Sequence, residues 1–344
     1  MKPDPLLTIC VPAYNSQKTV GRTLESILEQ TYLNFEVLVS DNNSTDDTIK
    51  IAESFKDQKV TIRKNIQTIV SNKYMGCYDN YNGCIKSGLI RGEFVAFYHS
   101  DDIYNKEIAE REVAFLMDHP EVGAVFTMAN KIDQNDNIIG KRQLPKDLTM
   151  LKKNIYQFPE IFKSILCNGN IFLITPTFMT RTKIFNEIGL FSEEQFGTSS
   201  DLEMWLRILK KHPIGILKNP LINHRISGGG KSYSKARSKR ADFFKVIDYY
   251  LQKDSLPEIE KKTLRQYELQ KYLDDILLAI NFFVRNQITE AIMLLKKPLT
   301  FAIIQALFEN ISITRIKIVV LKIVLLVGIF LGLTKPLSKL LKKI

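Results

Sequence analysis

The first hundred residues alternate between apolar runs and amphipathic segments, and this alternation limits the folds open to the chain. Strands are predicted at 6–15, in the first part of 35–55, at 59–65 and at 92–102. Helices are predicted at 18–30, where apolar residues recur at helical spacing, in the second part of 35–55, and at 81–90. Strands that alternate with helices favour right-handed crossovers, so we expect an α/β fold with a mainly parallel sheet flanked by helices.

Polar clusters follow three of these predicted strands. They read "PAYN" after the first strand, "SDNNST" after the second and "HSDD" after the fourth. Ligands of open α/β sheets bind outside the carboxyl ends of the strands. The sequence therefore predicts one site at that edge, built from all three clusters.

The third cluster places two carboxylates, Asp101 and Asp102, next to each other. Like charges at this distance repel, and three environments would hold them together: bulk water, a helix N-terminus or a bound cation. A helix N-cap before residues 103–113 is compatible with a ligand role for Asp101 and a cap role for Asp102.

The second half of the chain is less regular. We expect a helix, a His-Pro break and a short strand in 110–126, a strand that becomes a helix in 170–194, an amphipathic helix at 200–212, and strand and turn at 215–227. Helical sequence follows. Glycines and basic residues cluster near Gly230, which predicts a first domain of residues 1–229 and a helical region of residues 230–344.

The basic residues concentrate towards the C-terminus. The chain carries a formal net charge of +11, and from Asn310 onwards it has no acidic residue, while lysines alternate with Ile, Val and Leu. This pattern favours an anionic membrane surface, contacted from about residue 311. The apolar run 323–333 has only 11 residues, against about 20 for a span. An in-plane helix is therefore preferred, with a span or a buried core helix as alternatives.

The composition also excludes several classes of protein. Four cysteines at irregular spacing match no zinc or redox pattern and argue against a disulfide framework. The first ten residues lack an apolar run of secretory type, which predicts a cytoplasmic location. The chain lacks the interleaved aromatic and basic residues that are typical of RNA-binding proteins, so we expect no nucleic acid partner.

With these clusters in place, the chain resembles the family 2 glycosyltransferases, inverting enzymes of GT-A fold that use nucleotide-sugar donors. The resemblance rests on "TICVPAYNSQKTVGRTLESILEQTY", "FEVLVSDNNSTDDT", "GEFVAFYHSDD", "GLFSEE" and "SDLEMWLRI", in that order between about Leu6 and His224.

The resemblance implies a nucleotide site made by the first two loops and the acidic motif. Its residues would be Pro12, Ala13, Tyr14, Asn15, Asp41, Asn42, Ser100 and Asp101. A carboxylate at Asp41 accepts a hydrogen bond from the imide N–H of uracil or thymine, which favours a UDP- or dTDP-sugar. The alternative for Asp41 is a plain Asx turn.

The same resemblance equates "HSDD" with the family's acidic metal motif. His99 stands where the family commonly has the first Asp, which leaves His99, Asp101 and Asp102 as the implied ligands of Mn²⁺ or Mg²⁺. The cation would relieve the repulsion of the acidic pair and stabilise the leaving diphosphate.

Asp201 falls at the family's general base position, with Ser200 in place of a Glu. Glu203 is the rival base. His224, Arg225 and Lys231 are possible diphosphate contacts in a mobile lid. Asn80, Tyr81 and Asn82 match a subgroup pattern. The two asparagines are interpreted as loop residues, with a contact to the sugar or the diphosphate as the alternative.

The leading interpretation is transfer of one sugar to a glycan or lipid-linked acceptor in cell-surface polysaccharide synthesis, on the inner face of the membrane. A second interpretation makes polyprenyl phosphate the acceptor, which needs no strong base. A third is a non-catalytic module that binds anionic membranes on a transferase scaffold.

Overall fold

A computed structural model describes residues 4–55, 60–64, 76–226, 237–253 and 259–343. The chain divides into two compact units. The first unit comprises Met1–Phe162 and Asn170–Ser227, and the second comprises Lys163–Gly169 and Gly228–Ile344. The second unit thus includes the segment 163–169, which the predicted first domain of residues 1–229 had contained.

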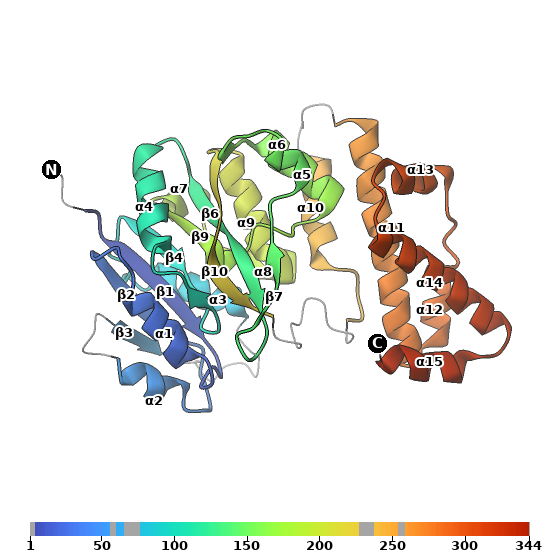
Figure 1. The fold of residues 1–344 in the computed structure, drawn as a ribbon, viewed down its shortest axis with the longest axis horizontal. Helices are drawn as coiled ribbons and strands as arrows, with labels where there is room; N and C mark the ends of the chain where they lie inside the picture. The colour runs from blue at the N-terminus through green and yellow to red at the C-terminus, as the bar shows by residue number, and fades with distance from the viewer. Residues whose placement is uncertain (1–3, 56–59, 65–75, 227–236, 254–258, 344) are drawn as a thin grey trace. The chain divides into compact units, whose positions relative to one another are not determined.

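The first unit contains one ten-stranded sheet (Figure 1). Its strands are β1 (Leu7–Ala13), β2 (Phe35–Asp41), β3 (Val60–Lys64), β4 (Phe94–Phe97), β5 (Ile103–Tyr104), β6 (Ala124–Ile132), β7 (Ile138–Arg142), β8 (Ile155–Tyr156), β9 (Phe178–Arg181) and β10 (Ile214–Arg225). The main path is β3-β2-β1-β4-β9-β6-β10-β5, while β7 pairs with β6 and β8 with β10.

The sheet is parallel over β3, β2, β1 and β4, as predicted from the alternation of strands and helices. Beyond β4 it is mixed, because β9 runs antiparallel to both β4 and β6. The strand β9 begins after a 3₁₀ turn, η1 (Thr175–Thr177). The strand expected at the start of 170–194 therefore lies eight residues later.

Helices cover both faces of this sheet. They are α1 (Val20–Leu28), α2 (Thr48–Glu53), α3 (Cys77–Lys86), α4 (Ile108–Asp118), α5 (Lys146–Thr149), α6 (Phe158–Asn168), α7 (Ile184–Ile188), α8 (Glu193–Phe196) and α9 (Ser200–Leu209), with the 3₁₀ turn η2 (Gly197–Ser199) before α9. Apolar residues of α1, α2 and α4 share a core with alternate residues of β1 and β2. On the opposite face the Tyr81 ring of α3 packs on Phe97, and Trp205 of α9 packs on Phe178.

The helix expected at 81–90 is in fact α3, which begins at Cys77 and ends at Lys86. The chain leaves the helix through Gly88, whose φ of 71° suits glycine in the left-handed region. At the other end, the backbone N–H of Tyr78 donates to the Glu193 carboxylate at 3.1 Å. That cap comes from residues far along the chain, so local sequence could not reveal where the helix starts.

The second unit is helical, as predicted. Its elements are α10 (Asp242–Lys253), α11 (Lys261–Val284), α12 (Ile288–Leu295), α13 (Phe301–Glu309), α14 (Ile313–Phe330) and α15 (Thr334–Lys343). Its core is centred on α11, whose apolar residues pack with Ala291, Ala306 and Leu325 of the later helices. None of the helices that the structure describes combines the length and apolar character needed to cross a bilayer.

Candidate active site

Two loops at the carboxyl edge of the parallel strands are tied to each other. The Asn15 backbone N–H donates to Ser44 Oγ at 2.9 Å, and the Thr45 N–H donates to Asn15 Oδ1 at 2.9 Å. The Ser16 N–H donates to Thr48 Oγ1 at 2.7 Å. Asn15 adopts a φ of 48°, which lets the β1–α1 loop turn sharply beside the β2–α2 loop. The loop between β4 and β5, here called the acidic loop, contacts the β1–α1 loop, because Ser16 Oγ and Ser100 Oγ lie 2.8 Å apart.

These loops enclose a cavity of about 580 Å³. The residues predicted for the site that line it are Pro12, Ala13, Tyr14, Asn15, Asn42, His99, Ser100 and Asp101. The predicted convergence of the three polar clusters is thus seen in the structure. Asp41, Asp102, Asp201, His224 and Arg225, all described residues, are not in the lining of this cavity.

Asp41 is buried beneath the cavity and anchors its own turn. Its carboxylate accepts the Ser44 backbone N–H at 2.9 Å and the Ser44 hydroxyl at 2.5 Å. The bond to the Ser44 N–H spans three residues, whereas an Asx turn bonds the N–H two residues on, so the carboxylate holds the loop without forming the plain Asx turn that the sequence left open. A contact between Asp41 and a base stays a prediction, whereas the neighbouring Asn42 reaches the cavity wall.

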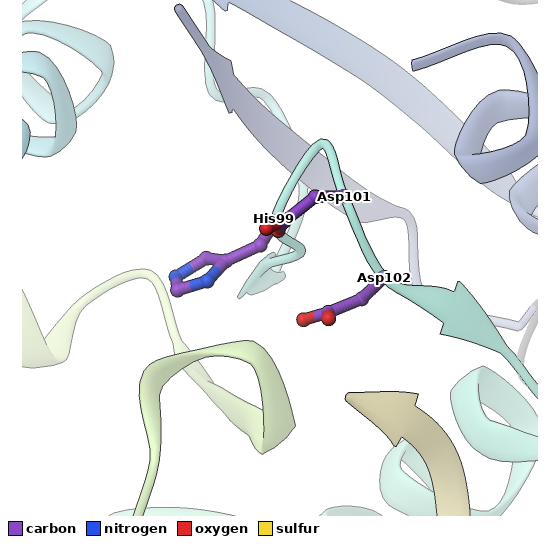
Figure 2. A group of neighbouring side chains, drawn as sticks. All are labelled: His99, Asp101 and Asp102. Atoms are coloured by element: carbon purple, nitrogen blue, oxygen red, sulfur yellow. The ribbon is translucent and has the colours of Figure 1, made fainter. Parts of the chain in front are cut away.

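His99, Asp101 and Asp102 form a cluster whose potential ligand atoms lie within 4.8 Å of one another. Figure 2 shows that all three side chains project from the short loop between β4 and β5. Asp102 is fully buried, and its Oδ1 accepts the Arg225 backbone N–H at 2.7 Å. Its Oδ2 has no hydrogen-bond partner among the described residues. Burial, and next the charge of Asp101, raise the pKa of Asp102 well above its usual value.

The donor set of this cluster fits a divalent cation. Burial lowers the pKa of His99, so its imidazole stays neutral near pH 7, which is the form that binds metals. Its Nε2 lies 2.8 Å from the Tyr81 hydroxyl, which orients the ring. A buried carboxylate oxygen without a partner, beside a second carboxylate and an imidazole, is a combination that Mn²⁺ accepts and Mg²⁺ accepts less readily.

The two described residues of the predicted lid, Arg225 and His224, have different environments. Arg225 holds the acidic loop, because its Nε donates to the Asp101 carbonyl at 2.8 Å and its Nη1 donates to the Asp133 carbonyl at 2.7 Å. Its guanidinium also pairs with Asp136. His224 is largely buried, which lowers its pKa to about 3. Lys231 lies outside the described residues, and contacts of the three with a diphosphate stay predictions.

Asp201 lies in the first turn of α9. Its Oδ1 accepts the Leu202 N–H at 2.7 Å, and Thr175 Oγ1 lies 3.4 Å from its Oδ2. Burial raises the pKa of Asp201 above its usual value, which makes the carboxylate a stronger base. The rival Glu203 is buried and receives two hydrogen bonds from Arg207, at 3.0 and 2.7 Å. That ion pair gives Glu203 a structural role.

Among the lining residues that the sequence analysis did not assign to the site are Asn80 and Tyr81. Asn80 was interpreted as a loop residue, but it lies within α3, where its amide donates to the Ser40 carbonyl at 2.8 Å and accepts the Ser40 hydroxyl at 2.6 Å. Tyr81 follows it and reaches His99. Asn82 is also helical and bonds to the backbone of Phe191. The signal in the sequence was the "NYN" triplet at 80–82. Because the helix was predicted to begin at residue 81 and not at Cys77, Asn80 was interpreted as a loop residue.

A mixed α/β sheet with a polar cavity and an acidic cluster at the carboxyl edge of its parallel strands is the arrangement expected of a glycosyltransferase of GT-A fold. The chain belongs to glycosyl transferase family 2, whose family model matches residues 8–189. The fold class and the enzyme class predicted from the resemblance are therefore confirmed.

Two curated relatives are about a quarter identical to the chain over the aligned residues. It is 26% identical over 275 residues to the UDP-Glc:alpha-D-GlcNAc-diphosphoundecaprenol beta-1,3-glucosyltransferase WfgD of Escherichia coli, covering 78% of this chain and 93% of WfgD. It is 24% identical over 282 residues to the chondroitin synthase of Escherichia coli, covering 80% of this chain but only 38% of that protein.

Solved structures show the same fold. The poly(ribitol-phosphate) beta-N-acetylglucosaminyltransferase TarS of Staphylococcus aureus, residues 1–349 in complex with UDP-GlcNAc, superposes with a TM-score of 0.59 at 22% identity, covering 84% of this chain and 79% of that one. The mannosyltransferase PcManGT of Pyrobaculum calidifontis, in complex with GDP-Man and Mn²⁺, superposes with a TM-score of 0.53 at 15% identity, covering 99% and 85%.

Proposed function

We propose that the chain transfers a sugar, with inversion, from a UDP- or dTDP-sugar to a hydroxyl of a glycan or lipid-linked acceptor in cell-surface polysaccharide synthesis. The observation that carries this proposal is the cavity of about 580 Å³, in which the β1–α1 loop faces the acidic cluster. The WfgD and TarS names support the choice of a uridine donor.

In this proposal each part of the site has one task. The loop residues 12–15 and Asn42 bind the nucleoside, and Asp101, Asp102 and His99 hold the cation. When bound, the cation neutralises charge on the leaving diphosphate. Asp201 takes the proton from the acceptor hydroxyl as it attacks. Arg225 keeps the acidic loop in place, because its guanidinium donates to the Asp101 carbonyl and its backbone N–H donates to the Asp102 carboxylate.

Donor hydrolysis in the absence of acceptor tests this assignment. We expect the wild-type chain to release nucleoside diphosphate from a UDP- or dTDP-sugar at least about tenfold faster with Mn²⁺ than with EDTA, because the cation supplies several kcal/mol of charge stabilisation. GDP-mannose, the ligand of PcManGT, serves as the contrasting donor. If no donor is hydrolysed, and calorimetry detects no Mn²⁺-dependent binding of UDP, the proposed function is wrong.

The second unit supports a proposed location at an anionic membrane surface. On α14 an apolar stripe recurs every three or four residues, which places it on one helix face. Its members, with exposures from 46% to 89%, are Ile313, Ile316, Val320, Ile323, Val327 and Phe330. Lys317 and Lys335 are exposed nearby in sequence, whereas Lys322 is buried against the Tyr272 hydroxyl, at 2.6 Å. An exposed apolar stripe with flanking cations fits a helix lying in the membrane plane.

Replacing two stripe residues tests this location. We expect Val327→Asp with Phe330→Asp to lower partitioning of the full chain onto phosphatidylglycerol vesicles by about tenfold or more, because each side chain loses burial worth roughly 1 kcal/mol or more. Vesicle co-sedimentation measures the bound fraction. The matched control, Leu264→Asp with Leu277→Asp, changes two exposed leucines of α11 and should bind as the wild type does. Equal binding by all three proteins would contradict the proposal.

A further inference from the structure

A second cavity of the first unit, of about 760 Å³, has a strongly basic lining. We refer to it as the basic cavity. Its five cationic residues are Lys141, Arg142, Lys146, Lys152 and Lys218, and no carboxylate lines it. The four lysines make no ion pair with the residues that the structure describes. These lysines are exposed, and such a concentration of positive charge attracts anions to the basic cavity.

The basic cavity also has apolar walls. Met128, Leu144 and Met150 line it together with Pro220, and Met150 is 78% exposed. No aromatic side chain is among its described lining residues, so it offers no surface for stacking a nucleobase. Several cations beside flexible apolar side chains suit an anion of high charge that is attached to an apolar chain.

Strand pairing connects the basic cavity to the acidic cluster. Arg142 on β7 pairs with Ala129 on β6, Ala129 pairs with Ile222 on β10, and Ile222 pairs with Tyr104 on β5. Tyr104 follows Asp102 by two residues. Three strand spacings correspond to roughly 15 Å. The Arg142 guanidinium also donates to the Ile171 carbonyl at 3.2 Å, in the segment that leads to Thr175 beside Asp201.

We propose that the basic cavity binds the diphosphate of a lipid-linked acceptor, with the first part of its lipid chain on the apolar wall. This inference rests on the proposed function and names the site that holds the acceptor. The lysines neutralise the diphosphate, and the acceptor saccharide extends from the basic cavity towards Asp201. We refer to the cavity of about 580 Å³ between the β1–α1 loop and the acidic cluster as the donor cavity. The basic cavity shares no described lining residue with the donor cavity, so the protein can hold donor and acceptor at the same time.

Farnesyl diphosphate is a soluble probe for this site. We expect wild-type protein to bind it, and Lys141→Ala with Lys218→Ala to bind it about tenfold or more weakly, because two charge-assisted contacts with the phosphates are lost. Both lysines are exposed, so their removal leaves folding intact. The matched control, Lys50→Ala with Lys106→Ala, removes two exposed lysines of the same unit that line neither cavity and should bind as the wild type does.

Two related probes separate the parts of the ligand. Farnesol, without phosphate, should bind at least about tenfold more weakly than farnesyl diphosphate, since it lacks the group that the lysines neutralise. If inorganic pyrophosphate binds as tightly as farnesyl diphosphate, the apolar wall contributes nothing and the lipid part of the proposal is overturned. If the double variant Lys141→Ala with Lys218→Ala binds farnesyl diphosphate as tightly as the wild type, the basic cavity is not the acceptor site.

Metal-dependent release of nucleoside diphosphate, measured on the same preparations, distinguishes this inference from the proposed function. Suppose that Lys141→Ala with Lys218→Ala leaves both the release of nucleoside diphosphate and the binding of farnesyl diphosphate unchanged. This result would overturn the acceptor site alone. Absent release and absent binding of UDP would overturn the proposed function, whatever the basic cavity binds.

Discussion

Asp101→Ala is expected to reduce metal-dependent release of nucleoside diphosphate from the preferred donor by about 100-fold or more. Asp101 is the member of the acidic pair that lines the donor cavity, whereas Asp102 is fully buried behind it. Loss of one ligand weakens the hold on a cation that supplies several kcal/mol of charge stabilisation, and each 1.36 kcal/mol is a factor of ten in rate. Release of UDP or dTDP with Mn²⁺ over a range of concentrations measures the effect.

The substitution should also change how the protein binds nucleotide. Calorimetry with UDP is expected to show tighter binding in Mn²⁺ than in EDTA for the wild type, and no difference between them for Asp101→Ala. Asp118→Ala, which removes an exposed carboxylate at the end of α4, is the matched control and should behave as the wild type does. If Asp101→Ala keeps both its turnover and its Mn²⁺ dependence, the cation is not bound by this loop.

The fold and the donor cavity were predictable from the sequence to a large extent, because both depend on local signals. Alternating strand and helix patterns gave the parallel half of the sheet, and Asn15 and Ser100 follow strands directly. The carboxyl ends of parallel strands meet at one edge, so residues that follow them must be neighbours. This is why "PAYN" and "HSDD" were placed together correctly.

The unpredicted features depend on contacts between residues far apart in the chain. The Arg225 N–H that donates to Asp102 Oδ1 comes from 123 residues away, and the Glu193 carboxylate that caps the start of α3 comes from 115 residues away. Asn80 and Tyr81 reach the cavity only because α3 begins where that cap places it. The antiparallel direction of β9 was not predicted for a related reason, since its partners β4 and β6 lie far from it in sequence.

Two positions in the site also show which features can be predicted from the sequence and which require the structure. The sequence left two roles open for Asp41, a contact with the base and an Asx turn, and the structure shows its carboxylate bonded to Ser44, three residues further on. It also left Asp201 and Glu203 as rival bases. The ion pair of Glu203 with Arg207 lies within one helix, four residues apart. Spacing indicated that such a pair is possible, but only the burial of Glu203 and its two hydrogen bonds from Arg207 show that Glu203 is committed to it.

Asp201→Asn is expected to reduce sugar transfer to a hydroxyl acceptor by about 10²- to 10⁴-fold, the usual contribution of a positioned general base. Hydrolysis of the donor without acceptor, and Mn²⁺-dependent binding of UDP, should stay within about twofold of the wild type, because neither needs that base. Comparing the two rates on one preparation separates loss of the base from loss of folding. Equal loss of both activities would instead indicate a structural role for Asp201.

The pH dependence of transfer provides a second readout for the same residue. Burial raises the pKa of Asp201, so the carboxylate takes up a proton, and loses its function as a base, at higher pH than an ordinary Asp of pKa about 3.9. Transfer by the wild type should therefore fall as the pH falls through this raised pKa, and the residual transfer by Asp201→Asn should lack that decline. If the acceptor were polyprenyl phosphate, whose oxygen is already ionised, Asp201→Asn would retain near wild-type transfer, and the hydroxyl acceptor would be excluded.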